Sequence, residues 1–161
     1  MVGCRRYPSE LPGIHQRERE GIRLRLSTKG RYGMAAMVYL AKHAGEGPLP
    51  LSRVAETGIQ PDYLEQLLAS LRREGLVHAQ RGAQGGYTLA RPPEEITIRQ
   101  VLNATEGPVR FCECSVDESA CARKETCDTR EIFIALSRQV NGLLDSITLA
   151  SVLRDMDHKG E

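Results

Sequence analysis

The sequence predicts a mainly α fold with a small β hairpin, followed by a long C-terminal helix. Three features predict it: apolar residues at helical spacing between Gly and Pro stops, two β-prone runs around a glycine-rich turn, and a regular apolar repeat near the C-terminus. The chain has 161 residues, 40% of them hydrophobic and 27% charged, which suffices for one buried core. We find neither an apolar run of membrane-spanning length nor a secretory signal, so we expect a cytoplasmic protein with no membrane partner.

The order of these features suggests five segments. Residues 1–22 show no apolar periodicity and are predicted to be a disordered tail. We expect the α and β elements of a folded domain in residues 23–105 and a cysteine-rich loop in 106–128. The long helix then occupies 129–153, and a flexible tail occupies 154–161.

The first helix is predicted to begin at Ser27 or Thr28, either of which can cap it, and to end near His43. Ser52 is expected to cap a short second helix, Arg53 to Glu56, which Gly58 closes. The apolar and aromatic repeat of the first helix consists of Tyr32, Ala36, Tyr39, Leu40 and His43.

A third helix is predicted to start at Pro61, because proline fits the first helical turn, and to stop at Gly75. Its buried stripe consists of Leu64, Leu67, Leu68 and Leu71.

Two β-prone runs, 76–79 and 87–90, flank a glycine-rich turn and predict a hairpin. Thr97 and Gln100 then form a capping box for another helix. The apolar face of that helix comprises Ile98, Val101 and Leu102.

The long helix carries a seam of apolar residues spaced alternately three and four positions apart, which is typical of a coiled coil. A terminal helix cannot bury such a seam alone, so we predict a homodimer; packing back onto its own domain is the alternative. Residues 146–148 are a possible break before a last helical segment. The predicted dimerisation residues are Phe133, Leu136, Val140, Leu143 and Ile147.

Two short helices around a tight turn, followed by a hairpin, form a winged helix-turn-helix, in which the second helix fits the major groove of DNA. The charge is divided accordingly: residues 23–91 carry +5 and residues 92–161 carry −5. Double-stranded DNA is therefore the expected partner, and we find no constellation of catalytic residues that would indicate an enzyme.

Residues at or on the outward face of the third helix are the candidate base-reading groups: Gln60, Asp62, Tyr63, Glu65 and Gln66. Ser70 is predicted to lie on the same outward face. Arg72 and Arg73 suit contacts to phosphates, and Arg81 on the wing suits the minor groove. Lys29 and Ser52, at the starts of the first two helices, complete the candidate DNA-binding set.

At these residues the chain resembles the IscR-, NsrR- and CymR-type winged helix-turn-helix regulators, the Rrf-two family. The resemblance covers about residues 24–153 and is nearest to the IscR-like iron–sulfur regulators. It implies a homodimer on a palindromic operator and a cysteine loop that binds a regulatory cluster. The segments that carry it are LSTKGRYG (26–33), YLEQLL (63–68), LRREGLV (71–77), RGAQGGY (81–87) and ITL (147–149).

Four of the five cysteines lie between Cys112 and Cys127, and in a reducing compartment such crowding indicates metal binding or redox chemistry. The cluster-binding relatives space their three cysteine ligands C-x5-C-x5-C. Here Cys114, Cys121 and Cys127 follow that pattern with one inserted residue, so the resemblance assigns them as ligands of an iron–sulfur cluster, [2Fe–2S] in preference to [4Fe–4S].

The fourth ligand departs from the family pattern. IscR-like proteins have a histidine where this chain has Arg130, and NsrR-like proteins use a carboxylate of the partner's first helix where this chain has Arg31. Cys112, Asp128 and Glu131 remain candidates.

Zinc held by four cysteines is the alternative, although the x1, x6, x5 spacing is not a common zinc pattern. A regulator without a cluster, such as a repressor of cysteine metabolism with a zinc or thiol site, would share the same DNA-binding unit. Cys4 is predicted to be a bystander. The resemblance begins at Leu24, where relatives start, so the native chain is hypothesised to begin there.

Overall fold

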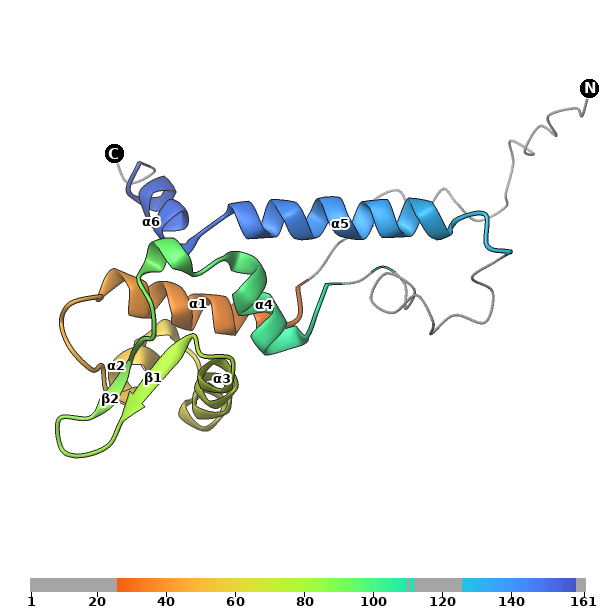
Figure 1. The fold of residues 1–161 in the computed structure, drawn as a ribbon. Coiled ribbons are helices and arrows are strands. Elements are labelled where there is room, and N and C mark those ends of the chain that lie inside the picture. Colours follow the sequence, from red (N-terminus) through yellow and green to blue (C-terminus); the bar gives the residue numbers. More distant parts are fainter. Residues whose placement is uncertain (1–25, 110, 112–125, 159–161) are drawn as a thin grey trace, which may run out of the picture.

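The computed structural model describes residues 26–109, 111 and 126–158, which form a mainly helical fold with one small antiparallel sheet (Figure 1). The predicted fold class is confirmed. The elements in chain order are α1 (Thr28–Lys42), α2 (Leu51–Val54), η2 (Ala55–Thr57), α3 (Pro61–Arg73), β1 (Val77–Gln80), β2 (Gly86–Leu89), η3 (Pro93–Glu95), α4 (Ile98–Glu106), α5 (Arg130–Ser146) and α6 (Leu149–Asp157).

Helix α1 is the centre of the core and packs against α3, α4, α6 and β2. The predicted stripe of α3 is confirmed, since all four of its leucines are buried against α1. In α1 the predicted repeat holds at Ala36 and Leu40, but Tyr32 is exposed. The buried face of α1 instead combines small and apolar residues: Gly30, Gly33, Ala36, Met37, Leu40 and Ala41.

The small residues of α1 have a geometric cause, because α4 crosses it closely. A Cβ atom placed on Gly33 would overlap the Thr105 side chain, and one on Gly30 would overlap the Glu106 carboxylate. Two glycines one turn apart therefore leave room for the Thr105 and Glu106 side chains of α4 to pack directly on the backbone of α1.

Most predicted helix ends are confirmed by their caps. Ser27 accepts a hydrogen bond from the Gly30 amide at the start of α1, and Thr97 and Gln100 form the complete capping box of α4. Gly58 and Gly75 have φ angles of 82° and 67°, the left-handed conformation that ends a helix.

Ser52 does not cap α2, contrary to the sequence prediction. The helix begins one residue earlier, at Leu51, and Pro50 occupies the N-cap position. The Pro50 carbonyl accepts the first helical hydrogen bonds, from Arg53 at 3.0 Å and Val54 at 3.3 Å, so no side-chain cap is used. Ser52 is exposed within the helix.

The predicted hairpin is confirmed, with Val77 opposite Leu89 and Gln80 opposite Gly86. An isolated bridge adds Leu49 to its edge, because Leu49 and Tyr87 exchange hydrogen bonds of 3.0 and 2.8 Å. The hairpin is thereby attached to the segment that joins α1 to α2.

Helix α5 extends past α4, away from the end of the molecule that carries α3 and the hairpin (Figure 1). It ends at Ser146, within the predicted break. Helix α6 then returns the chain to the core and runs to Asp157, beyond the boundary at residue 153 that was expected for the last helix. Leu149 of α6 is fully buried there, and its amide donates to the Ile96 carbonyl at 2.9 Å.

Candidate functional site

The exposed face of α3 presents the residues that were predicted to read bases. Gln60 at the N-cap and Asp62, Glu65 and Gln66 are exposed, while Tyr63 is half-buried. Because the leucine stripe fixes the rotation of the helix on the core, these polar side chains share the outer face.

Tyr63 is supported by an aromatic residue that the sequence prediction did not assign to the site. The Tyr32 ring of α1 meets it edge-to-face, with ring centroids 6.0 Å apart and planes at 73°. This favourable aromatic geometry limits the positions that Tyr63 can adopt. No sequence signal links the two residues, since they lie on separate helices.

Ser70, predicted on the outward face, is instead buried at 8% exposure, where its hydroxyl is hydrogen-bonded within α3. Its hydroxyl donates to the Gln66 carbonyl at 3.2 Å and accepts from the Arg73 guanidinium at 3.1 Å. The spacing of three residues between Ser70 and Arg73 is a signal that could have identified this pair from the sequence.

Lys29, at the start of α1, comes together with Tyr63, Gln66 and Arg73 around a surface hollow of about 340 Å³. The hollow therefore has two cationic groups beside two of the candidate base-reading residues. Such an arrangement suits a polyanionic ligand, since cations can neutralise phosphates while the polar groups contact base edges.

The remaining candidates lie on neighbouring elements. Arg72 is exposed beside Arg73, and Arg81 is exposed in the loop between β1 and β2. The hairpin lies next to α3 at the same end of the molecule (Figure 1), while Ser52 lies on α2. The fold thus groups the third helix and the wing, as a groove-reading unit requires.

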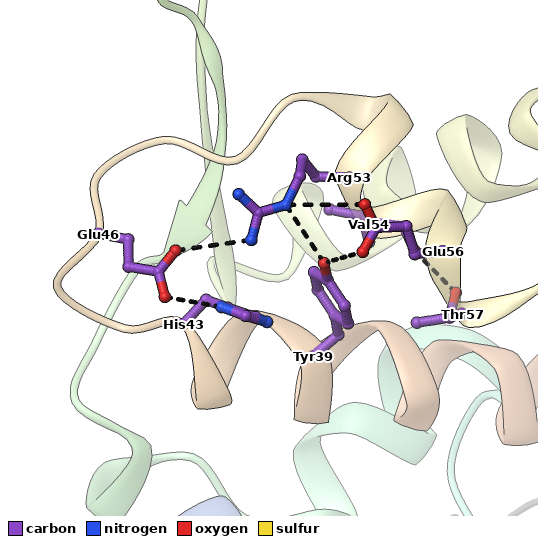
Figure 2. Close-up of polar contacts among 7 residues, drawn as sticks. All are labelled: Tyr39, His43, Glu46, Arg53, Val54, Glu56 and Thr57. Atoms are coloured by element: carbon purple, nitrogen blue, oxygen red, sulfur yellow. Dashed lines mark hydrogen bonds and ion pairs between the residues drawn. The ribbon is translucent and has the colours of Figure 1, made fainter.

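A polar network braces α2 against α1 (Figure 2). Tyr39 donates to the Glu56 carboxylate at 2.9 Å, and the Arg53 guanidinium lies 3.8 Å from Glu56 and 3.6 Å from Glu46. His43 pairs with Glu46 at 2.8 Å. The hydrogen bond from His43, with smaller contributions from Arg53, lowers the pKa of Glu46, so the carboxylate is the favoured form.

Of the predicted cluster ligands, only Cys127 falls within the described residues; Cys112, Cys114 and Cys121 lie outside them. Cys127 is half-buried just before α5, 3.5 Å from the Thr129 hydroxyl. Hydrogen bonds from the side chain and backbone of Thr129 lower the pKa of its thiol. A thiol with a lowered pKa suits metal ligation, because the thiolate is the form that binds.

The candidate fourth ligands near Cys127 are accessible. Asp128 is exposed, and the Glu131 side chain is 80% exposed while it pairs with Arg130 at 2.8 Å. No group of three metal-binding side chains occurs within 26–109, 111 and 126–158.

The predicted dimerisation seam leaves a large apolar surface on α5. Phe133 and Leu136 are each 38% exposed and Leu143 is 62% exposed, whereas Val140 is half-buried. Ile147 lies just beyond the helix as its C-cap, and its carbonyl accepts from the Ile98 amide at 2.9 Å. Four of the five seam residues are thus on α5, and the fifth contacts α4.

Comparison with known proteins identifies this architecture. A family model, Rrf2, described as iron-dependent transcriptional regulator, matches residues 26–155. The chain belongs to the Rrf2 family. Its relatives are transcriptional regulators and not enzymes, so this Rrf2 protein is a transcriptional regulator. The family binds DNA.

The sequence relatives and the solved structures that this Rrf2 protein resembles include two kinds of regulator, IscR and CymR. IscR of Serratia proteamaculans is 39% identical, over 83% of this chain and 82% of its own. CymR of Bacillus subtilis is 40% identical, over 86% and 96%.

Among solved structures, IscR of T. potens is 40% identical with a TM-score of 0.68, covering 86% of this chain and 92% of that one. CymR of B. subtilis, titled the global cysteine regulator, is 42% identical with a TM-score of 0.64, covering 81% and 96%. In none of the described segments of the present chain does a helix have the length and apolarity needed to cross a membrane.

Proposed function

We propose that this Rrf2 protein acts as a cytoplasmic homodimer that binds a palindromic operator and senses iron–sulfur cluster status, redox change or nitric oxide. Its targets would be genes of cluster assembly or a related stress response. The observation that carries the proposal is the exposed polar face of α3 beside Lys29 and Arg73, in a chain whose Cys127 lies just before α5 and belongs to a trio of cysteines in the sequence. The resemblance to IscR supports the same assignment.

On DNA, α3 would enter the major groove with Tyr63, Glu65 and Gln66 toward base edges. Gln66 can pair with adenine, and Glu65 can accept from cytosine. Lys29, Arg72 and Arg73 would contact phosphates, which fixes the position of α3 without specifying sequence. Arg81 would enter the minor groove beside the wing.

The cluster would be held by the thiolates of Cys114, Cys121 and Cys127, with Cys112, Asp128 or Glu131 as fourth ligand. The donor set fits such a group: three thiolates on one loop match iron–sulfur ligation, and Cys127 has the required lowered pKa. When bound, the cluster supplies a change of charge or ligation in response to oxidants, nitric oxide or loss of iron.

A direct connection from the loop to the DNA-reading face runs through Glu106, the last residue of α4. Its carboxylate accepts from the Ser27 amide at 3.0 Å and the Ser27 hydroxyl at 2.9 Å, which anchors the start of α1. Lys29 and Tyr32 follow within the next turn, and Tyr32 supports Tyr63. A movement of the loop that displaces Glu106 would therefore alter the position of the reading helix.

The test is anaerobic purification followed by cluster reconstitution, with visible absorption, Mössbauer spectra and iron and zinc analysis. We expect a coloured protein with iron, loss of the colour in Cys127→Ser, and no loss in Cys4→Ser as the matched control. A footprint on the DNA upstream of its own gene should then differ between apo and holo protein.

The second candidate is the same DNA-binding regulator with a zinc or thiol site, which the comparable similarity to CymR favours. One zinc and no iron after reconstitution would select the zinc site. A colourless, metal-free protein that still binds the promoter would select a thiol-based regulator.

A further inference from the structure

We propose that the crevice between the end of α1 and the base of the hairpin binds a small organic carboxylate with an apolar body, and that its occupancy changes the affinity for DNA. None of the residues that line the crevice belongs to α3. Its volume is about 490 Å³, within the range of roughly 300–1,000 Å³ that is common for small-molecule sites.

The lining combines an apolar wall with few polar groups, the composition that is usual for such sites. Leu40 of α1, Leu89 of β2 and the Pro92–Pro93 pair supply apolar surface. Arg91 supplies a cation, and His43 contributes to the rim. An apolar carbon skeleton that carries one anionic group matches this lining.

Arg91 is half-buried, and within the described parts of the chain no carboxylate lies at ion-pair distance from it. The Arg91 guanidinium donates one long hydrogen bond, of 3.5 Å, to the Gln100 side-chain oxygen. That oxygen already accepts from the Thr97 amide at 3.1 Å in the capping box. Arg91 can therefore turn to an incoming carboxylate, which it can bind with two parallel hydrogen bonds, while α4 keeps its cap.

The opposite wall is held in place before any ligand binds. Figure 2 shows that the Glu46 carboxylate contacts both His43 and Arg53. The two distances are 2.8 and 3.6 Å, and these contacts hold the loop that follows α1. Gly45 and Gly47 of that loop line the crevice. A preformed wall lowers the entropy cost of binding.

The position of the crevice connects it to the wing. Leu49 lines the crevice and is paired with Tyr87 of β2. Leu89, the last residue of β2, and Ala90, which follows it, also line the crevice. An occupant would alter how β2, and with it Arg81, is oriented relative to α3. The predicted effect on DNA affinity rests on the proposed function, in which the wing contacts DNA. The predicted binding of the carboxylate is independent of it.

The test uses the full-length ¹⁵N-labelled protein titrated with 4-methylpentanoate, and with 4-methylpentanamide as the uncharged control. We expect chemical-shift changes of the backbone amides of Gly45, Gly47 and Ala90. 4-Methylpentanamide should bind at least about tenfold more weakly than 4-methylpentanoate. Arg91→Gln should weaken carboxylate binding by a similar factor, while Arg154→Gln on the exposed surface of α6 should not. Ala44→Phe, at an exposed position that lines the crevice, should block the site.

The proposed site would be overturned if no chemical shift changed, if the changes lay elsewhere on the protein, or if 4-methylpentanamide bound as tightly as 4-methylpentanoate. The DNA arm repeats an operator titration with and without a saturating probe in wild type and Arg91→Gln. A change of operator affinity with the probe in wild type but not in Arg91→Gln supports the effector role. Binding of the probe without any change of operator affinity overturns that role. Failure to bind any operator in the absence of probe would count against the proposed function and leave the binding result intact.

Discussion

Gln66 and Arg72 lie on the same helix, but their contacts with DNA would have different consequences. A glutamine that pairs with a base edge discriminates between sequences, whereas an arginine on a phosphate adds the same affinity to every sequence. Both side chains are exposed, so replacing either should leave the core of α3 intact.

We predict that Gln66→Ala costs about 1–3 kcal/mol on the native operator and relaxes the preference at one base pair. Arg72→Gln should weaken binding to all sequences and reduce the slope of log affinity against log salt by about one. Fluorescence anisotropy with base-substituted operators, repeated over a salt series, measures both effects. A uniform loss in Gln66→Ala would show that Gln66 does not read a base.

The residues that the sequence could not identify act through distant partners. Glu106 and Ser27 are 79 positions apart, and the Tyr32–Tyr63 contact joins two helices, so neither leaves a local pattern. The caps at Ser27 and Thr97 and the stops at Gly58 and Gly75 were predictable because each depends on a few adjacent residues.

At the scale of elements, α1 depends on two very different contacts. Along one side, the side chains of α4 pack on its backbone at two glycines, which a periodicity argument treats as weak helix formers. The second contact is the polar network that joins its C-terminal end to α2. The buried stripe of α3 was predictable because a leucine repeat indicates burial. The glycine contacts of α1 and the start of α2 after Pro50 were not predictable, because neither has such a repeat.

We predict that Gly33→Ala destabilises the fold by about 1–3 kcal/mol, because the new methyl group overlaps the Thr105 Cγ2 methyl. Thr105→Ser removes that methyl and keeps the hydroxyl that donates to the Val101 carbonyl at 2.9 Å. The double variant should therefore recover much of the loss in urea unfolding. Additive losses in the double-mutant cycle would contradict this account.

The acid stability of the α1–α2 connection should depend on Glu46. Its pKa is lowered in the folded state, first by the hydrogen bond from His43, so its carboxylate stabilises the fold above the ordinary value of 4.5. That contribution is lost as the pH falls through the lowered pKa. We expect the melting temperature of wild type to exceed that of Glu46→Gln at pH values above 4.5, and the gap to close as the pH falls below that value and through the lowered pKa. Glu94→Gln, an exposed glutamate on η3, is the control; a gap that is constant with pH would rule out the carboxylate as its source.

At the scale of the whole molecule, α5 projects from the domain with an apolar surface that the described residues of its own chain leave exposed. Leu136 and Leu143 are 38% and 62% exposed, and the only buried residue of the helix is Ser137. A dimer would bury this surface and set two reading helices at the spacing of two half-sites, roughly 34 Å. The apolar spacing predicted the seam, but the sequence alone could not separate pairing with a partner from packing on the same chain.

We predict that Leu136→Lys converts the protein to a monomer and weakens operator binding by more than about tenfold, because a lysine cannot be buried unpaired in an apolar interface. Gln139→Lys, at an exposed position outside the seam, should remain dimeric. Sedimentation velocity and anisotropy, with circular dichroism as a check of folding, give the result. A dimeric Leu136→Lys would place the interface elsewhere.

The burial of Leu149 has a consequence for synthesis of the protein. The core of the DNA-binding part is completed by α6, which follows both the cysteine loop and α5, so this core cannot close while the chain is still being translated through them. A nascent or truncated product that ends within α5 would contain every candidate base-reading residue but would expose the side of α1 and η3 that α6 covers. Such products should be substrates for proteolysis before they can compete for operators.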